Sequence, residues 1–248
     1  MTLEQFFAEN QRVALAFSGG VDSAYLLYAA KRHGAQVTAY YVKTPFQPQF
    51  EYADALRLAQ ELHAPVVTVE LDILSDSNIA ENPENRCYYC KKRIFTAILE
   101  RAKQDGISLV IDGTNASDEA SDRPGMLALE QLQVRSPLRE CGLTKGEIRR
   151  LSKEAGLFTH DKPAYACLAT RIPTGTPITM ELLEKTERSE AFLRGLGFTD
   201  FRIRLLGESA RLQLTEAEIP LLLQHRERIL AQLKKDYSAV LLDLEVRQ

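Results

Sequence analysis

The stretch RVALAFSGGVDSAYLL, residues 12–27, decides the fold of this chain. Its first residues form a short apolar run, which is typical of a buried strand. From about Asp22 to Arg32, apolar residues recur at the spacing of one helix face. The two glycines between these segments favour a tight turn. The stretch therefore predicts a strand, a glycine turn and a helix in direct succession.

The same alternation of strands and helices continues toward residue 156. We predict further strands at 36–42, 65–71, 108–113 and 133–138, and helices at 51–63, 93–106 and 144–156. The stretch ENRCYYCKKR (84–93), which holds Cys87 and Cys90, is expected in a polar loop. Strands that alternate with helices indicate right-handed βαβ units. The predicted fold is therefore α/β, with a doubly wound parallel sheet that binds ligands at the carboxyl ends of its strands.

The pattern changes after Pro163. A helix is expected at 181–197, a hairpin from 201–206 and 209–214, a second helix at 216–234 and a last strand at 239–246. These elements would form a small C-terminal α+β domain of ordinary size. We therefore expect two domains, one over residues 1–170 and the other over residues 171–248.

Composition and charge narrow the class of protein. The chain has 248 residues, of which 45% are hydrophobic, and a net charge of −3. The start, MTLEQFFAENQ, lacks the basic and apolar regions of a signal peptide, and no apolar run approaches the roughly 20 residues of a membrane helix. We expect a cytoplasmic protein with no membrane association, and the charge does not favour nucleic acid as a partner.

The glycine turn has the features of a phosphate-binding loop. Glycines let backbone N–H groups approach an anion, and the helix that follows adds its dipole. Asp22 would repel bare phosphate but can hold a magnesium ion that bridges phosphates. The loop lacks the lysine of the G-x-x-x-x-G-K-[ST] motif, so it is not a loop of that type. The predicted nucleotide-binding residues here are Ser18, Gly19, Gly20, Asp22 and Ser23.

The segment GTNASD, residues 113–118, follows the fourth predicted strand and should reach the same edge of the sheet. SGGVDS resembles the PP-loop of the ATP pyrophosphatase superfamily, whose fold is that of the adenine nucleotide alpha hydrolases. Enzymes of that superfamily attach AMP to a substrate oxygen and release pyrophosphate. A G-T-x-x-x-D segment lies beside their nucleotide, so the resemblance implies roles for Gly113 and Thr114 and makes Asp118 a second magnesium ligand.

Further motifs resemble one branch of this superfamily over essentially the whole chain. They are SGGVDS, the cysteine pair, RPGMLALEQLQVRSPL (123–138), PAYACLATRIP (163–173) and the strands FRIR and SARLQL. Together they resemble the LarE-type ATP-dependent sulfur transferases, which form thiocarboxylates on a pyridinium dicarboxylate mononucleotide during synthesis of the nickel-pincer nucleotide cofactor. The resemblance implies an AMP- and pyrophosphate-forming enzyme that uses ATP and magnesium and forms homo-oligomers.

By this resemblance, Cys167 matches the cysteine that attacks the acyl-adenylate, gives up its sulfur and becomes dehydroalanine. Lys162 and Arg171 flank it, and their positive charges would favour its thiolate. The expected contacts to the substrate phosphate and carboxylates are Arg123, Arg171, Arg202, Arg204 and Glu190. Gln213 stands where the family often has an acidic residue, which argues against a divalent-metal site there.

The cysteines allow several interpretations. Cys87, Cys90 and Cys167 suit a [4Fe–4S] cluster with one open iron, as in three-cysteine members of the family, and this is the arrangement we expect. The alternatives left open are a sacrificial Cys167 with spectator thiols, a redox pair, and a zinc site completed by two of Cys141, Cys167 and His160. We interpret Cys141 as structural.

Three other functions compete with sulfur transfer to a nucleotide. A tRNA-thiolating PP-loop enzyme would share the loop and the cysteines but needs a basic surface. An amide-forming adenylating synthetase would share the loop, and nothing in it requires three cysteines. A nucleotide-binding regulatory module would not explain a pyrophosphate loop beside thiols.

Overall fold

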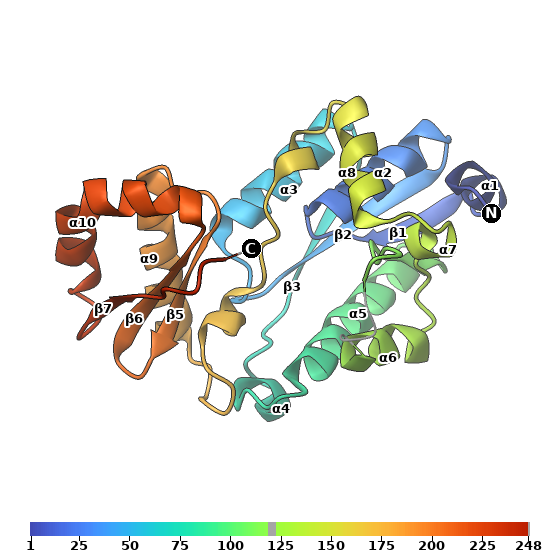
Figure 1. Ribbon diagram of the computed structural model, residues 1–248. Helices are drawn as coiled ribbons and strands as arrows, with labels where there is room; N and C mark the ends of the chain where they lie inside the picture. The colour runs from blue at the N-terminus through green and yellow to red at the C-terminus, as the bar shows by residue number, and fades with distance from the viewer. Residues whose placement is uncertain (119–122, 248) are drawn as a thin grey trace. The chain divides into compact units, whose positions relative to one another are not determined.

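The computed structural model describes residues 1–118 and 123–247 and divides the chain into two compact units (Figure 1). The first unit comprises Met1–Ile73 and Asn85–Ala164. The second comprises Leu74–Glu84 and Tyr165–Gln248. The sequence does not predict that the short segment 74–84 belongs with the C-terminal part of the chain.

A parallel sheet forms the centre of the first unit. Its strands are β1 (Arg12–Ala16), β2 (Gln36–Lys43), β3 (Val66–Glu70) and β4 (Val110–Ile111), arranged in the order β3-β2-β1-β4. Every pair of neighbouring strands is parallel, with Ala14 beside Thr38 on one side and beside Val110 on the other. This confirms the predicted α/β fold.

Helices cover both faces of this sheet (Figure 1). The helices of the first unit are α1 (Leu3–Glu9), α2 (Val21–Arg32), α3 (Gln49–Glu61), α5 (Arg86–Gln104), α6 (Arg123–Gln131), α7 (Pro137–Glu140) and α8 (Lys145–Glu154), with a 3-10 turn η2 (Phe158–Asp161). One apolar core contains buried residues of α1, α2, α3 and α8, and the other contains those of α5 and α6. Burial on both faces explains why β1 and β2 are apolar almost throughout.

Two predicted elements of the first unit are wrong in detail. The cysteine pair does not lie in a loop, because α5 begins at Arg86 and carries Cys87 and Cys90 in its first turns. No proline or glycine interrupts this stretch, so nothing opposes the helix. The strand predicted at 133–138 is reduced to a single bridge between Arg135 and Ile111. Pro137 then starts α7, a position that suits proline because its missing N–H would be unpaired there.

The second unit holds a small mixed sheet. The strands β5 (Phe201–Leu206) and β6 (Ser209–Leu214) form the predicted hairpin, and β7 (Val240–Leu242) pairs parallel to β6. Gly207 turns the hairpin at a φ of 58°, which glycine adopts without strain. The helices of this unit are α4 (Ser77–Ala80), α9 (Met180–Gly195) and α10 (Ile219–Leu233), with 3-10 turns η3 (Leu168–Arg171) and η4 (Glu216–Glu218).

Asn82 attaches the segment 74–84 to the rest of the second unit. Its side chain is buried and donates to the Pro173 carbonyl at 2.9 Å, and its own carbonyl accepts from the Gly175 N–H at 2.8 Å. These hydrogen bonds join residues that are far apart in sequence, so local patterns do not reveal them. Within the described parts of the chain, we find no helix that has both the length and the apolar character needed to cross a membrane.

Candidate functional site

The glycine turn between β1 and α2 has a tightly defined backbone. Gly19 has a φ of 75°, and a Cβ at this position would lie 2.8 Å from the Cβ of Ala55 in α3. Inside the turn, the Ser18 and Ser23 hydroxyls are 3.1 Å apart, and the Ser23 Oγ donates to the Gly20 carbonyl at 3.2 Å. The turn therefore requires glycine for both its dihedral angle and its contact with α3.

The loop after β4 packs directly against the start of α2. A Cβ on Gly113 would come within 2.9 Å of the Ser23 backbone nitrogen, so only glycine permits this approach. Asn115, which is buried, connects the two loops: its side chain donates to Asp22 at 3.3 Å and its backbone N–H donates to Asp118 at 2.8 Å. One residue thus orients both carboxylates that the sequence suggests as magnesium ligands.

Lys145, the first residue of α8, makes an ion pair with the same Asp22 carboxylate. Its backbone N–H also donates to the Ser117 hydroxyl at 2.9 Å. Local patterns in the sequence indicate neither Lys145 nor Asn115 as a site residue. Asn115 lies within the GTNASD segment, where the acidic Asp118 carries the recognisable chemistry. No local pattern identifies Lys145, because it reaches Asp22 from 123 positions along the chain.

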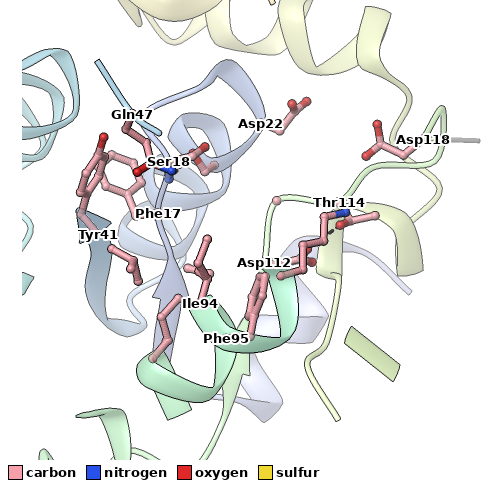
Figure 2. Close-up of a pocket in the computed structure, with 16 residues that line it drawn as sticks. Phe17, Ser18, Asp22, Tyr41, Gln47, Ile94, Phe95, Asp112, Thr114 and Asp118 are labelled. Carbon is pink, nitrogen blue, oxygen red and sulfur yellow. Dashed lines mark hydrogen bonds between the residues drawn. The ribbon is translucent and has the colours of Figure 1, made fainter. Parts of the chain in front are cut away.

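These two loops border a pocket of about 310 Å³, close to the lower end of the range for small-molecule sites. Figure 2 shows the Asp22 and Asp118 carboxylates on one side and Ile94 and Phe95 on the other. The pocket is lined by Ala16, Phe17, Ser18, Asp22, Ser23, Tyr41, Val42, Gln47, Lys91, Ile94, Phe95, Ile98, Asp112, Gly113, Thr114 and Asp118. Gly19 and Gly20 shape the turn but are not among the lining residues.

Asp112 is a buried carboxyl group in the wall of this pocket. Its Oδ1 accepts from the Ser136 hydroxyl at 2.6 Å, and its Oδ2 accepts from the Thr114 hydroxyl. Burial raises the pKa of Asp112, and these hydrogen bonds and the charge of Lys91 partly oppose the rise. The sequence does not mark Asp112 as a site residue, because it lies in the apolar pattern of the predicted strand 108–113.

Helix α5 places the cysteine pair next to the pocket. Lys91, Ile94, Phe95 and Ile98 line the pocket and share one face of this helix. Cys87 lies four residues before Lys91, so the helical repeat puts it on that same face, one turn closer to the N-terminus. Cys87 is exposed and Cys90 is partly buried.

The other two cysteines lie in different surroundings. Cys141 is partly buried against the core of the first unit, and burial raises the pKa of its thiol. Cys167, in the second unit, precedes the turn η3 and is partly buried. None of the four forms a disulfide. In the described residues, no group of three or more His, Cys, Asp or Glu side chains could hold a metal ion.

The basic residues of the second unit gather around β5. Arg202 is buried, and burial, with the nearby charges of Arg171 and Arg247, lowers its pKa to about 10. Arg204 donates to Gln213 at 2.6 Å and to the Thr170 carbonyl at 2.9 Å. Burial and neighbouring arginines also lower the pKa of Arg204. Binding of an anion to such a cluster of cations is electrostatically favourable, because it offsets the repulsion between the like charges.

The remaining predicted residues behave differently. Arg171 and Glu190 are buried and pair with each other at 2.8 Å. Lys162, expected to act on Cys167, makes ion pairs with Glu51 at 2.9 Å and Asp54 at 2.8 Å within the first unit. The side chain of Arg123 lies outside the described residues. Gln213 donates to Asp243 at 2.9 Å and so links Arg204 to that carboxylate.

Known proteins resemble this chain over all or part of its length. The model of the tRNA methyl transferase HUP domain matches residues 11–127. An uncharacterised protein of Synechocystis sp. is 37% identical over 88% of this chain and 81% of its own length. The pyridinium-3,5-bisthiocarboxylic acid mononucleotide synthase of Lactiplantibacillus plantarum is 35% identical over 98% of this chain and 89% of its own length. The chain belongs to the LarE family.

Other relatives place the LarE family among the PP-loop enzymes. A tRNA-specific 2-thiouridylase of Clostridium botulinum is 29% identical over 60% of this chain, which corresponds to 52% of that enzyme. The match to the HUP domain covers the glycine turn, both pocket loops and the cysteine pair. As a PP-loop ATP-dependent sulfur transferase, the protein is expected to place ATP in the pocket described above.

Proposed function

We propose that this protein uses ATP to convert a carboxylate of a pyridinium dicarboxylate mononucleotide into a thiocarboxylate, during synthesis of the nickel-pincer nucleotide cofactor. The observation that supports this proposal most directly is the 35% identity, over 98% of the chain, to an enzyme named for the bisthiocarboxylic acid product. The pocket between the glycine turn and the β4 loop supports the ATP-dependent part of the reaction. In that step a carboxylate oxygen attacks the α-phosphorus, and the bond to pyrophosphate breaks.

The first unit would carry out this adenylation. The N–H groups of the glycine turn, with Ser18 and Ser23, would hold the phosphates. Asp22 and Asp118 would bind magnesium, which commonly uses one or two carboxylates together with substrate phosphates. Gly19, Gly20, Gly113 and Thr114 would shape the site. Lys91, which also lines the pocket, would add positive charge that the loop itself lacks.

The second unit would hold the anionic groups of the substrate. Arg202 and Arg204 are the main candidates, because burial and like charges make their environment favourable for an added anion. Guanidinium groups also match phosphate and carboxylate geometry. We retain Arg123 as a further candidate for substrate binding.

Sulfur would reach the adenylated carbon through Cys167 itself or through a cluster. A [4Fe–4S] cluster with one open iron takes three cysteine ligands, and we keep Cys87, Cys90 and Cys167 as its candidates by residue type alone. Cys87 and Cys90 lie three residues apart near the start of α5, and Cys167 belongs to the second unit. When bound, such a cluster would supply an open iron that binds sulfide. In the alternative route, the Cys167 thiolate attacks the acyl carbon and AMP leaves with the electron pair, which gives a thioester. Removal of the Cys167 Cα proton by a base then breaks the Cβ–S bond, so the thiocarboxylate leaves with the sulfur and its electron pair and dehydroalanine remains.

The test is an anaerobic reaction of the protein with ATP, magnesium and the pyridinium dicarboxylate mononucleotide. We expect pyrophosphate and thiocarboxylate to appear together, and Asp22→Asn to abolish both. Arg57→Lys, on the exposed side of α3, is a matched control that should leave both unchanged. Pyrophosphate release that does not depend on the nucleotide substrate would contradict the proposal.

Two measurements separate the sulfur routes. A bound cluster should colour anaerobically purified protein brown, and Cys87→Ala should bleach it. The sacrificial route instead lowers the intact mass by one hydrogen sulfide molecule after a single turnover. Colourless protein with repeated turnovers and an unchanged mass would contradict both routes. Tight, salt-sensitive binding of tRNA would instead favour a tRNA-thiolating enzyme like the 2-thiouridylase relatives.

We further propose that the protein acts in the cytoplasm and forms homo-oligomers through its second unit. A reducing compartment suits three functional thiols. Leu241 and Leu242 of the edge strand β7, and Leu244 just after it, are exposed, and apolar groups at a strand edge favour association. Light scattering should report a mass above that of one chain, and Leu242→Lys should lower it. A wild-type mass equal to one chain would contradict self-association.

A further inference from the structure

Tyr165, Arg171 and Glu190 form a cluster in the second unit, which we call the Glu190 cluster. The Arg171 guanidinium binds the Glu190 carboxylate through two parallel hydrogen bonds, from Nε at 2.8 Å and from Nη2 at 3.1 Å. The Tyr165 hydroxyl donates to the same carboxylate at 2.6 Å. The Arg171 side chain has no exposed surface, and that of Glu190 is only 2% exposed. This geometry is the bidentate pairing that gives the strongest side-chain ion pairs.

The Glu190 carboxylate has no capacity left for a ligand. Its Oε1 accepts from the Arg171 Nε and from the Ile203 backbone N–H at 3.0 Å, and its Oε2 accepts from the Arg171 Nη2 and the Tyr165 hydroxyl. A carboxylate has about four lone-pair sites, and here all are used within the protein. A metal ion or substrate could bind Glu190 only by breaking bonds that are well shielded from water.

Arg171 extends from this carboxylate to the segment that carries Cys167. Its Nη1 donates to the Ala166 carbonyl at 2.9 Å, to the Thr170 hydroxyl at 2.8 Å and more weakly to the Cys167 carbonyl at 3.4 Å. Thr170 donates from its backbone N–H and its hydroxyl to that Cys167 carbonyl, at 3.0 and 2.8 Å. The peptide groups on both sides of the Cys167 Cα are therefore fixed, and with them the direction of its Cα–Cβ bond.

We propose that Arg171 and Glu190 are positioning residues that fix the Cys167 sulfur for transfer, in place of the substrate contacts expected from the sequence. This inference rests on the proposed function and deepens it. It holds whether the sulfur attacks the adenylate or ligates a cluster, because both require a defined sulfur position. Lysine could not replace Arg171, since an ammonium group cannot bind the carboxylate bidentately and also reach the Ala166 carbonyl.

The decisive experiment compares Arg171→Lys with Arg188→Lys, a control on α9 whose arginine makes an exposed pair with Asp236. Displacing a reacting group by about 1 Å lowers rates roughly a hundredfold. We expect Arg171→Lys to lower kcat for thiocarboxylate formation between about tenfold and a hundredfold, with unchanged KM for ATP and for the nucleotide substrate. Arg188→Lys should match the wild type. A raised KM for the nucleotide substrate with unchanged kcat would overturn the proposal, because it would indicate a direct substrate contact.

Alkylation of Cys167 separates positioning from electrostatic activation. In protein freed of metal with a chelator, peptide mass mapping follows iodoacetamide labelling of Cys167, with Cys141 as the internal reference. Loosening the segment should make Cys167 label faster while kcat falls. If Arg171 acted chiefly by stabilising the thiolate, labelling and kcat would fall together, and that result would overturn the proposal. Cys141 should label at the wild-type rate in every variant.

A milder variant keeps the test valid if Arg171→Lys fails to fold. Tyr165→Phe removes one hydrogen bond to Glu190 and leaves the ion pair intact, so we expect about a fivefold loss of kcat. An unchanged kcat and labelling rate would contradict the proposal. Labelling does not depend on the reaction that the enzyme catalyses. A wild-type protein that makes no thiocarboxylate would contradict the proposed function, whereas the labelling comparison would still decide the positioning role.

Discussion

The glycine turn of the first unit and the Glu190 cluster of the second use polar groups in opposite ways. The turn leaves hydroxyls and carboxylates along a pocket, where Asp22 and Asp118 are held but remain accessible. In the Glu190 cluster, donors of the protein itself occupy both oxygens of the Glu190 carboxylate, so no acceptor position is left for a ligand. The first arrangement prepares a site for a ligand, and the second fixes the segment of backbone that carries Cys167.

The largest effect on stability should come from breaking the buried ion pair of the Glu190 cluster. Arg171→Met leaves the Glu190 carboxylate buried without its main partner, which typically costs about 3–5 kcal/mol in the free energy of unfolding. Chemical denaturation would measure this loss. The control is Arg57→Met, which breaks an exposed pair with Glu61 and should cost less than about 1 kcal/mol. Equal losses in the two variants would contradict the distinction between the buried and exposed pairs.

The next largest effect concerns the glycine turn. Gly19→Ala places a methyl group against Ala55 and forces alanine into a left-handed conformation. Together these two effects should lower the free energy of unfolding by roughly 2–3 kcal/mol. Because the turn would shift, ATP binding should weaken about a hundredfold. Gly34→Ala is the matched control: its φ of 77° is similar, but no atom lies within 4 Å of the added Cβ. Gly34→Ala should lower the free energy of unfolding only by the cost of holding alanine in a left-handed conformation. Its affinity for ATP, measured by titration calorimetry, should equal that of the wild type.

The same contrast explains which features could be predicted from the sequence. The glycine turn is local: a buried strand, two glycines and a helix are contiguous, so the pattern predicts the turn and its pocket-lining residues Ser18, Asp22 and Ser23. Local patterns do not predict two details of the first unit. Pro137 begins a helix within a predicted strand, and the polar stretch around Cys87, predicted as a loop, is helical.

The Glu190 cluster could not be predicted in this way. Arg171 and Glu190 are 19 positions apart, and the hydrogen bond from Tyr165 spans 25. Their charge, together with the resemblance to the family, predicts substrate binding, but burial decides whether such groups face a ligand or each other. The same limit applies to Lys145, whose partner Asp22 is 123 positions away. The sequence predicts sites whose residues are neighbours along the chain, whereas sites built from distant residues become visible only in the folded structure.

Asp112 offers a test that depends on pH. Burial raises its pKa above the unfolded value, so the native state binds more protons than the unfolded state between the two values. The stability of the wild type should therefore fall as pH rises through this window, by about 1.4 kcal/mol for each unit of separation. Asp112→Asn removes this dependence. Thermal unfolding should show the stability of the variant relative to the wild type increasing as pH rises from acid to neutral, and a decrease over the same range would contradict the assignment.

The smallest effect tests whether α8 supports the nucleotide pocket. Thr144 and Glu147 form a capping box at the start of α8, directly before the Lys145 that pairs with Asp22. Thr144→Ala should cost about 1 kcal/mol. Thr2→Ala breaks the same kind of capping box, with Gln5, at the start of α1 and should cost a similar amount. Only Thr144→Ala should also raise the KM for ATP, by about twofold to fivefold, because fraying of α8 loosens Lys145 and with it the Asp22 carboxylate. An equal KM in the two variants would show that Asn115 alone is sufficient to orient Asp22.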